Sequence, residues 1–289
     1  MTLPDVGMSV PQAVDPRVDV SSPLPFDKRG YRNILVLGGT GFVGRALLDR
    51  LVERSGGANQ RIVVPTRHRG HGRAIQMLPT VDLVDANVHD DATLAQLVRQ
   101  SDAVVNLIAI LHGNDAAFRR VNTELPMRLA RIFGSVGTRR LVHVSALGAS
   151  ESAPSAYLRS KAAGEAALTA AHLPLSVLRP SVIFGRDDRF LNTFASLQAV
   201  FPLMPLASSD ARFQPVWVDD VAMAIVRCLE DDATLGATYE CTGPDVYTLA
   251  QLVQMAGRWS GNPRRVWALP AALGRLQATL LEWLPGEPL

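Results

Sequence analysis

Short apolar runs recur along the chain, and a longer amphipathic stretch separates each run from the next. A short and nearly continuous apolar run is typical of a parallel strand that is buried on both faces. Regular alternation of such strands with helices indicates a parallel sheet covered on both sides, so we predict an α/β fold, a doubly wound parallel sheet of the Rossmann type. The predicted strands are residues 33–37, 61–67, 81–86, 102–110 and 139–145.

The stretches between these runs carry their apolar residues at helical spacing. In the first stretch, Leu47, Leu48 and Leu51 mark one face of a helix. A helix with one apolar face packs that face against the sheet, so each stretch supplies one covering helix. Further helices are predicted over 91–99, 115–133, 154–171, 187–201, 219–230 and 248–259.

The pattern divides the chain into three parts. Residues 1–30 are rich in Pro, Val, Asp and Ser and lack periodicity, so we expect a flexible N-terminal arm. Residues 31–180 hold the strand–helix alternation and form the predicted nucleotide-binding domain. Residues 181–289 are predicted to form a smaller C-terminal substrate lobe, interleaved with the sheet and ending in an amphipathic helix.

That terminal helix is predicted from a stripe of apolar residues. Leu269, Leu273, Leu276, Leu280 and Trp283 recur at intervals of four, three, four and three residues. Such a stripe lies on one side of a helix. The helix would pack on its own domain, or it would bind a membrane surface or a respiratory-complex partner, and the pattern leaves both alternatives open.

Composition narrows the function classes. The 289 residues are 47% hydrophobic with a net charge of +2, which fits a buried core and argues against a nucleic-acid partner. The two cysteines, Cys228 and Cys241, have no metal or disulfide spacing, so no metal site is predicted. The first 30 residues lack a basic segment followed by an apolar run, so we expect a cytoplasmic protein, with peripheral attachment to the inner membrane as the alternative.

The sequence GGTGFVG follows the first predicted strand and precedes the first predicted helix. In this setting Gly38 allows a tight turn, Gly41 lets backbone N–H groups approach a pyrophosphate, and Gly44 lets the helix pack close to the sheet. The helix N-terminus adds a dipole that favours the anion. The predicted cofactor-binding residues of this turn are Gly38, Thr40, Gly41, Phe42, Val43 and Gly44.

The end of the second strand distinguishes the two nicotinamide cofactors. A site for NAD(H) would place Asp or Glu there to bind the ribose 2′-hydroxyl. Positions 64–69 instead read VPTRHR, without a carboxylate. Arg67 can pair with a 2′-phosphate, assisted by His68 or Arg69, and we therefore predict NADP(H). The alternative is a solvated basic loop.

The ends of the next two strands carry further candidates. Asp85 and Ala86 end the third predicted strand, where an adenine edge would lie, and Asn106 and Ala109 end the fourth. Carboxyl ends of parallel strands line the ligand crevice of such sheets. Ordinary strand-end structure would place the same residues there, so this alternative stays open.

The helix predicted over 154–171 carries the candidate catalytic pair. The chain has 27 arginines but only two lysines, and one of them, Lys161, lies four residues after Tyr157. Residues four apart share a helix face, so the ammonium can stabilise a phenolate and lower the pKa of the tyrosine. An arginine would not perform that role together with a contact to a ribose.

These motifs together resemble the short-chain dehydrogenase/reductase superfamily over about residues 33 to 260. The larger C-terminal portion is similar to the extended or atypical branch. RPSVIFG at 179–185 looks like the loop of that branch after the sixth strand, where the backbone of Pro180 would lie near the nicotinamide. PVWVDDVAMAI at 215–225 looks like its later strand-to-helix segment.

A narrower resemblance concerns the nucleotide-binding accessory subunit of mitochondrial complex I and its bacterial relatives. YLRSKAAGE, QPVWVDDVA and above all FGRDDRFLN at 184–192 look like segments of that family. The resemblance implies a fold that holds NADPH as a structural ligand, and some members are linked to ubiquinone synthesis. It says more about the cofactor than about a reaction.

The catalytic serine of the superfamily lies just after the fifth strand, often as the second residue of a Ser-Ser pair. Here the segment reads HVSALGAS, in which Ser145 is followed by Ala146. Ser145 is the candidate that would reach a substrate carbonyl. Missing such a donor can cost about 10²–10³ in rate, so turnover depends on this position. Substitutes would be Ser150, Ser152 or Ser155.

Three functions are compatible with these residues. The first is an NADPH-dependent reductase of a carbonyl or quinone-related substrate, with Tyr157 as proton donor and Lys161 as its partner. The second is a non-catalytic NADPH-binding subunit or assembly factor of a membrane respiratory complex. The third is a nucleotide-sugar epimerase or dehydratase, against which the missing acid after the second strand counts.

Overall fold

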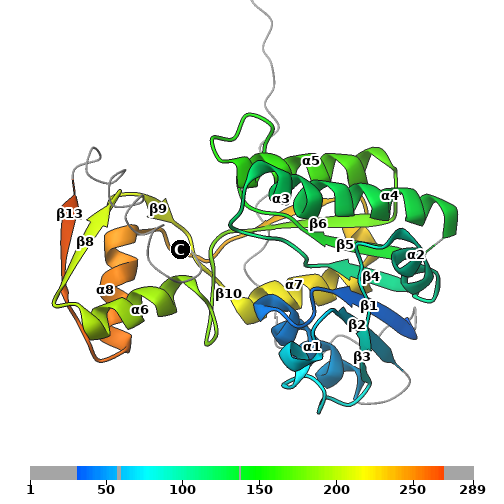
Figure 1. Cartoon of the computed structure of the whole chain (residues 1–289), viewed down its shortest axis with the longest axis horizontal. Helices are drawn as coiled ribbons and strands as arrows, with labels where there is room; N and C mark the ends of the chain where they lie inside the picture. The colour runs from blue at the N-terminus through cyan, green and yellow to red at the C-terminus, as the bar shows by residue number, and fades with distance from the viewer. Residues whose placement is uncertain (1–30, 57–59, 137, 270–289) are drawn as a thin grey trace, which may run out of the picture.

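A computed structural model describes residues 31–56, 60–136 and 138–269 of the chain. Within this part, the centre of the molecule is a seven-stranded sheet (Figure 1). Every pair of neighbouring strands in it is parallel. The strands are β1 (Asn33–Leu37), β2 (Arg61–Thr66), β3 (Val81–Asp85), β4 (Ala103–Asn106), β5 (Arg140–Val144), β6 (Leu175–Pro180) and β11 (Thr238–Cys241).

The order across the sheet is β11-β6-β5-β4-β1-β2-β3. The order 3-2-1-4-5-6 is that of doubly wound dinucleotide-binding folds, and here β11 is added beside β6. The predicted fold class is therefore confirmed. Since β11 comes from late in the chain, the C-terminal segment contributes to the sheet as well as to the smaller lobe.

Helices cover both faces of this sheet. In Figure 1, α1 and α7 lie on one side, and α3, α4 and α5 lie on the other. The strand residues alternate accordingly: Ile34 and Val36 pack in the core with α1 and α7, while Leu35 and Leu37 pack with α2 and α4. The helices are α1 (Phe42–Ser55), α2 (Asp91–Arg99), α3 (Asp115–Phe118), α4 (Leu125–Val136), α5 (Ala156–Ala170) and α7 (Val218–Glu230).

Two elements differ from the sequence-based expectation. The strand predicted over 102–110 ends at Asn106, whose side chain accepts a hydrogen bond from the Ile108 N–H (3.2 Å) and turns the chain out of the sheet. The helix predicted over 115–133 is continuous to Val136 but contains a π-helical segment, η2 (Arg119–Glu124). Helix α5 packs against this segment through Gly164, where a Cβ atom would collide with the Asn122 carbonyl oxygen.

The smaller lobe is built from the segments before and after α7. It lies to the left of the sheet in Figure 1 and has apolar clusters of its own between α6 and α8. Its strands form a parallel β8–β13 pair and an antiparallel β9–β12 pair. Its elements are α6 (Phe190–Val200), β8 (Leu203–Ala207), β9 (Arg212–Phe213), β12 (Tyr247–Thr248), α8 (Leu249–Trp259) and β13 (Arg265–Leu269).

Short elements connect the two parts and complete the described chain. A parallel pair, β7 (Ile183–Phe184) and β10 (Val216–Trp217), links the sheet region to the lobe. Two single-turn helices are η1 (Arg69–Gly72) and η3 (Asp232–Thr234). The predicted arm, residues 1–30, and all but the first residue of the predicted tail helix lie outside the described residues.

Candidate functional site

The glycine turn between β1 and α1 has the geometry that a bound pyrophosphate needs. Gly38 adopts φ +84°, a conformation that favours glycine, and its carbonyl accepts a hydrogen bond from the Gly41 N–H (3.0 Å). Gly44 is buried, and a Cβ atom there would lie 2.5 Å from the Gly38 oxygen. The chain can therefore hold the N-terminus of α1 tightly against the end of β1, with exposed Gly41 at the helix entrance.

The predicted cofactor residues of the turn lie together at this entrance. Gly41 is the N-cap, and Phe42 and Val43 form the first turn of α1. Neither the N-cap side chain nor an acidic residue in the first turn satisfies the helix N-terminus. A free helix N-terminus and its dipole favour an anion, so the turn fits a phosphate group.

Arg67 lies where the sequence predicted a contact with a 2′-phosphate, directly after the end of β2. Its side chain is exposed and makes no hydrogen bond to a described residue. The adjacent Thr66 pairs in register with Asp85 at the end of β3, and the Ala86 N–H donates to the Thr66 carbonyl (3.0 Å). Arg67, Asp85 and Ala86 therefore lie at neighbouring strand ends on one edge of the sheet.

Asn106, at the end of β4, is fully buried and bonds the neighbouring strand. Its amide nitrogen lies 3.1 Å from His143 Nδ1 on the neighbouring strand β5. Burial, and secondarily the charge of Lys161, lowers the pKa of His143 well below its usual value, so this imidazole is neutral at physiological pH. Ala109 follows on the exposed loop after β4.

Lys161 is the most buried charged group at this edge. Its side chain is 1% exposed, and Nζ donates a 2.7 Å hydrogen bond to the Val144 carbonyl at the end of β5. Desolvation lowers its pKa to about 8, while the nearby Glu165 carboxylate acts in the opposite direction. Glu165 in turn forms a two-point ion pair with Arg179 (2.7 and 3.1 Å). A lysine with this pKa keeps a proton at neutral pH and can still exchange it.

Tyr157 lies one helical turn before Lys161 on α5, as the spacing predicted. The phenol is half-buried, and its ring centroid lies 6.2 Å from that of Phe118 on α3. Burial raises the pKa of Tyr157 to about 12. The expected lowering by the ammonium is absent, because Lys161 directs its hydrogen bond to Val144 and burial is the cause that acts on the phenol.

Ser145 and Pro180 complete this group at the ends of β5 and β6. Ser145 is 4% exposed, and its Oγ has no hydrogen-bond partner among the described residues. Its backbone N–H donates to the Leu178 carbonyl (2.7 Å), and the Leu147 N–H donates to the Pro180 carbonyl (2.9 Å). These bonds tie the segment after β5 to β6 and bring Ser145, Pro180 and the Lys161 ammonium to the same edge.

The other serines considered as substitutes have different roles. The Ser155 hydroxyl caps α5 by accepting a hydrogen bond from the Leu158 N–H (3.1 Å). Ser150 and Ser152 lie 3.4 Å apart between their hydroxyl oxygens on an exposed turn. Ser155 therefore positions Tyr157 and Lys161 by starting their helix at the right residue.

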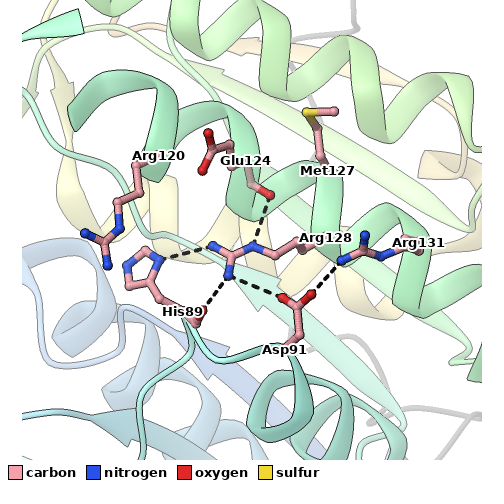
Figure 2. A pocket seen from close by; sticks show the side chains of 7 residues that line it. All are labelled: His89, Asp91, Arg120, Glu124, Met127, Arg128 and Arg131. Atoms are coloured by element: carbon pink, nitrogen blue, oxygen red, sulfur yellow. Dashed lines mark hydrogen bonds and ion pairs between the residues drawn. The ribbon is translucent and has the colours of Figure 1, made fainter. Parts of the chain in front are cut away.

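The structure has a basic pocket next to the ends of β2 and β3 that was not predicted from the sequence. It has a volume of about 640 Å³. Arg128 lies at its centre (Figure 2) and bonds the His89 carbonyl (2.7 Å), His89 Nδ1 (3.2 Å) and Asp91 (3.4 Å). The lining residues are His89, Asp91, Arg120, Glu124, Met127, Arg128 and Arg131.

The electrostatics of this pocket extend to Arg67. Burial lowers the pKa of His89, and the charges of Arg128, Arg120 and Arg67 lower it further, in that order. Arg120 makes no hydrogen bond to a described residue, and Figure 2 shows its guanidinium beside the His89 ring. Arg120, Glu124, Arg128 and Arg131 recur at intervals of four, four and three, a sequence signal that could have indicated one helix face.

Two further properties of the described residues concern membrane spans and metal sites. None of the helices in residues 31–269 that the structure describes is long and apolar enough to cross a membrane. Among the same residues, no three His, Cys, Asp or Glu side chains lie close enough together to hold a metal ion.

The parallel sheet, the glycine turn after β1 and the Tyr–Lys pair on α5 define a Rossmann-fold protein of the short-chain dehydrogenase/reductase type. Residues 34–241 match the NAD dependent epimerase/dehydratase family, and the chain belongs to that family. The solved UDP-glucuronic acid 4-epimerase from Bacillus cereus has a TM-score of 0.72 at 18% identity, covering 88% of this chain and 94% of its own. At that identity the likeness supports the fold alone.

Two curated relatives are informative at the level of sequence. The mitochondrial NADH dehydrogenase [ubiquinone] 1 alpha subcomplex subunit 9 of Mus musculus is 34% identical over 80% of this chain. The chain spans 63% of that subunit, less than two thirds of its length. A ceramide reductase of Caulobacter vibrioides is 26% identical over 84% of this chain and 75% of its own length.

Proposed function

We propose that the chain binds NADP(H) along the carboxyl edge of its sheet and reduces a carbonyl or quinone-related substrate. The observation that carries this proposal is the buried Lys161 next to Tyr157, on the edge that also holds the glycine turn. Burying an ammonium costs free energy, and a purely structural role would be served by an apolar residue. The ceramide reductase among its relatives supports a reductase reading.

The residues at this edge would share the work of binding and proton transfer. Gly41 and the first turn of α1 would hold the pyrophosphate, and Pro180 would flank the nicotinamide. When bound, NADPH would supply a hydride to the substrate carbon. Tyr157 would give its hydroxyl proton to the substrate oxygen, and the Lys161 ammonium would stabilise the phenolate that results.

The pKa values set a requirement for this mechanism. With a pKa of about 12, Tyr157 holds its proton at neutral pH but releases it reluctantly. Lys161, with a pKa of about 8, is cationic at pH 7. Lys161 follows Tyr157 by one helical turn on α5, and its ammonium bonds the Val144 carbonyl. For proton transfer the ammonium would have to approach the phenol.

Cofactor preference follows from the charge at the ends of β2 and β3. Arg67 is exposed directly after β2, and no carboxylate occupies positions 67–69. Burial lowers the pKa of His89, and the charges of Arg128, Arg120 and Arg67 lower it further, which indicates a positive potential in this region. A 2′-phosphate would be favoured there, and this supports NADP(H) over NAD(H).

The first experiment is a titration of the purified full chain with NADPH and NADH, followed by a test for oxidation of bound NADPH by quinones and carbonyl compounds. The proposal expects tighter NADPH binding and measurable oxidation. Tyr157→Phe should reduce turnover by about 10²-fold or more while leaving the NADPH affinity within about twofold. Unchanged turnover in Tyr157→Phe would remove Tyr157 from the mechanism.

A second candidate is a non-catalytic NADPH-holding subunit or assembly factor of a respiratory membrane complex. The sequence identity to the mouse NADH dehydrogenase subunit favours this candidate. The surroundings of Ser145 also favour it, because this serine is buried and the next residue is Ala146 in place of a second serine. NADPH would then stabilise the fold by mass action. Cofactor that co-purifies and resists oxidation by every substrate tried would support this candidate over the reductase.

A further inference from the structure

The outer face of the β8–β13 ribbon and the adjoining ends of α6 and α8 expose apolar side chains together with arginines. We call this surface the distal face; Figure 1 places β8 and β13 at the edge of the lobe farthest from the seven-stranded sheet. Its large apolar members are unusually exposed for their type. They are Val200 (74%), Phe201 (51%), Leu203 (41%), Trp259 (64%) and Trp267 (61%).

The strand register explains why Leu203 and Trp267 point outward. Leu203 pairs with Arg265, and Pro205 pairs with Trp267, so all four lie on the same side of the ribbon. The alternate residues Met204 and Leu206 are buried on the other side against α6 and α8. The inward side already supplies the core of the lobe, and the outward side is left to solvent.

Hydrogen bonds to Gln198 bring the end of α8 to the same corner. Gln198 is fully buried near the end of α6, and its side-chain amide donates to the Val253 carbonyl on α8 (2.8 Å). Its side-chain oxygen accepts from the Arg264 N–H (3.2 Å), and its carbonyl accepts from Arg264 Nε (2.9 Å). The ends of α6 and α8 and the start of β13 therefore form one rigid corner.

The charge of this corner has one sign. Residues 190–207 and 249–269 contain three arginines, Arg258, Arg264 and Arg265, and no Asp or Glu. Arg258 and Arg265 are exposed, and neither forms an ion pair with a described residue. Exposed apolar side chains and unpaired cations together fit a partner that offers both a negative surface and an apolar interior.

We propose that the distal face binds the surface of an anionic lipid bilayer. Tryptophan favours the level of the lipid headgroups, so Trp259 and Trp267 would lie there, and Val200 and Phe201 would reach the acyl boundary. Arg258 and Arg265 would contact lipid phosphates. A bilayer supplies both chemistries over an area as wide as the face, and the binding requires neither NADP(H) nor turnover.

The test is flotation of the full chain with vesicles of phosphatidylcholine alone or mixed with phosphatidylglycerol. Each arginine near such a surface is worth about 1 kcal/mol, or roughly fivefold, so Arg258→Gln with Arg265→Gln should weaken binding to the mixed vesicles about 30-fold. The matched control is Arg73→Gln with Arg99→Gln, two exposed arginines of the sheet domain, which removes the same charge and should change binding less than about twofold.

A second pair, Trp259→Ser with Trp267→Ser, tests the apolar part and should reduce binding to mixed vesicles at least about tenfold. Both side chains are mostly exposed, so thermal unfolding should confirm that the variants fold. Three results would overturn the proposal. The first is no binding to mixed vesicles, and the second is binding that both distal-face pairs leave unchanged. The third is a dimer in sedimentation that the Trp pair abolishes.

Discussion

The two edges of the seven-stranded sheet each hold a buried cation, and the two cations differ in how many hydrogen bonds they make to described residues. At the amino edge, Arg140 begins β5 as a fully buried cation, and its guanidinium bonds the Ser176 hydroxyl (3.1 Å), the Asp231 carbonyl (3.1 Å) and the Thr234 hydroxyl. At the carboxyl edge, the similarly buried Lys161 has one hydrogen bond to a described residue, the Val144 carbonyl. Each cation lies at one end of β5: Arg140 is its first residue, and Lys161 bonds the carbonyl of its last residue, Val144.

The difference between the edges can be explained by ligand binding, which needs polar groups that are free to bond a ligand at one edge. Asp102, just before β4, accepts hydrogen bonds from the Arg32 and Asn33 N–H groups (2.8 and 2.9 Å), so this carboxylate is used within the amino edge itself. The edge is not fully paired, because Gln60 Oε1 before β2 and Thr80 Oγ1 before β3 have no partner among the described residues. Around the carboxyl edge, the Ser145 Oγ has no hydrogen-bond partner in the described part of the chain, and Arg67 is exposed directly after β2. Ligands of parallel α/β sheets bind at the carboxyl edge, and the exposed Arg67 and the Ser145 hydroxyl, which no described residue bonds, lie there.

The largest expected effect breaks the amino edge. Arg140→Ala should lower the free energy of unfolding by about 3–5 kcal/mol, because it leaves a cavity and removes the donor for three oxygen acceptors. Urea unfolding would measure it. The adjacent Arg139→Ala is the control and should cost about 1 kcal/mol or less, since its ion pair with Asp102 is half exposed (52% and 28%). Equal losses in the two variants would contradict the contrast.

The features that could be predicted from the sequence also differ between the two edges. The glycine turn and the Tyr157–Lys161 pair were predicted correctly as elements, since each depends on residues within one turn or one helix. The Arg140 contacts were not predicted. They join residues 36 to 94 positions apart, and no local pattern encodes such distances. The predicted roles of the site residues stay predictions.

Two other features depended on tertiary packing in the same manner. The π-helical segment Arg119–Glu124 is packed against α5 at Gly164, which a helical periodicity of apolar residues does not reveal. The pKa of Tyr157 was expected to fall, and it rises to about 12, because spacing places Lys161 nearby without stating which oxygen its ammonium bonds. The periodicity of apolar residues locates a helix or strand, but the polar contacts of that element are made with elements that are distant in sequence.

Lys161→Met should stabilise the protein at neutral pH, whereas Arg140→Ala destabilises it. The folded-state pKa of Lys161 is about 8 against 10.5 in the unfolded chain, so holding its charge in the folded state costs about 3 kcal/mol at about 1.36 kcal/mol per unit. The lost hydrogen bond to Val144 returns about 1 kcal/mol of this. The net gain in the free energy of unfolding should therefore be about 2 kcal/mol.

The pH dependence of that gain has a definite sign. Below about pH 8 both states of the wild type hold the Lys161 proton, and the variant keeps its full advantage. Between about pH 8 and 10.5 the unfolded chain holds the proton and the folded chain has released it, so wild-type stability rises with pH and the advantage disappears. Urea unfolding of both proteins across this window tests it, and an advantage independent of pH would contradict a buried, charged Lys161.

Arg67→Ala probes the carboxyl edge without affecting the core. Arg67 is exposed and bonds no described residue, so its loss should leave the free energy of unfolding unchanged within about 0.5 kcal/mol. Loss of a charge-assisted contact to a 2′-phosphate should weaken NADPH binding by about 1.5 kcal/mol, roughly tenfold, and leave NADH binding nearly unchanged. A fluorescence titration distinguishes the two, and equal weakening of both cofactors would exclude the assignment.

Ser145→Ala should produce the smallest change in stability. The Ser145 Oγ is buried without a partner among the described residues, and such a hydroxyl costs free energy, so its removal should raise the free energy of unfolding by up to about 1 kcal/mol. The control Ser155→Ala should lower it by about 1 kcal/mol, because that hydroxyl caps α5. Changes of opposite sign in the free energy of unfolding at these two serines would confirm that the Ser145 hydroxyl, unlike that of Ser155, is left available for a ligand. If it is held for a substrate carbonyl, Ser145→Ala should also slow turnover about 10²-fold or more, and unchanged turnover would leave the proton chemistry to Tyr157 and Lys161 alone.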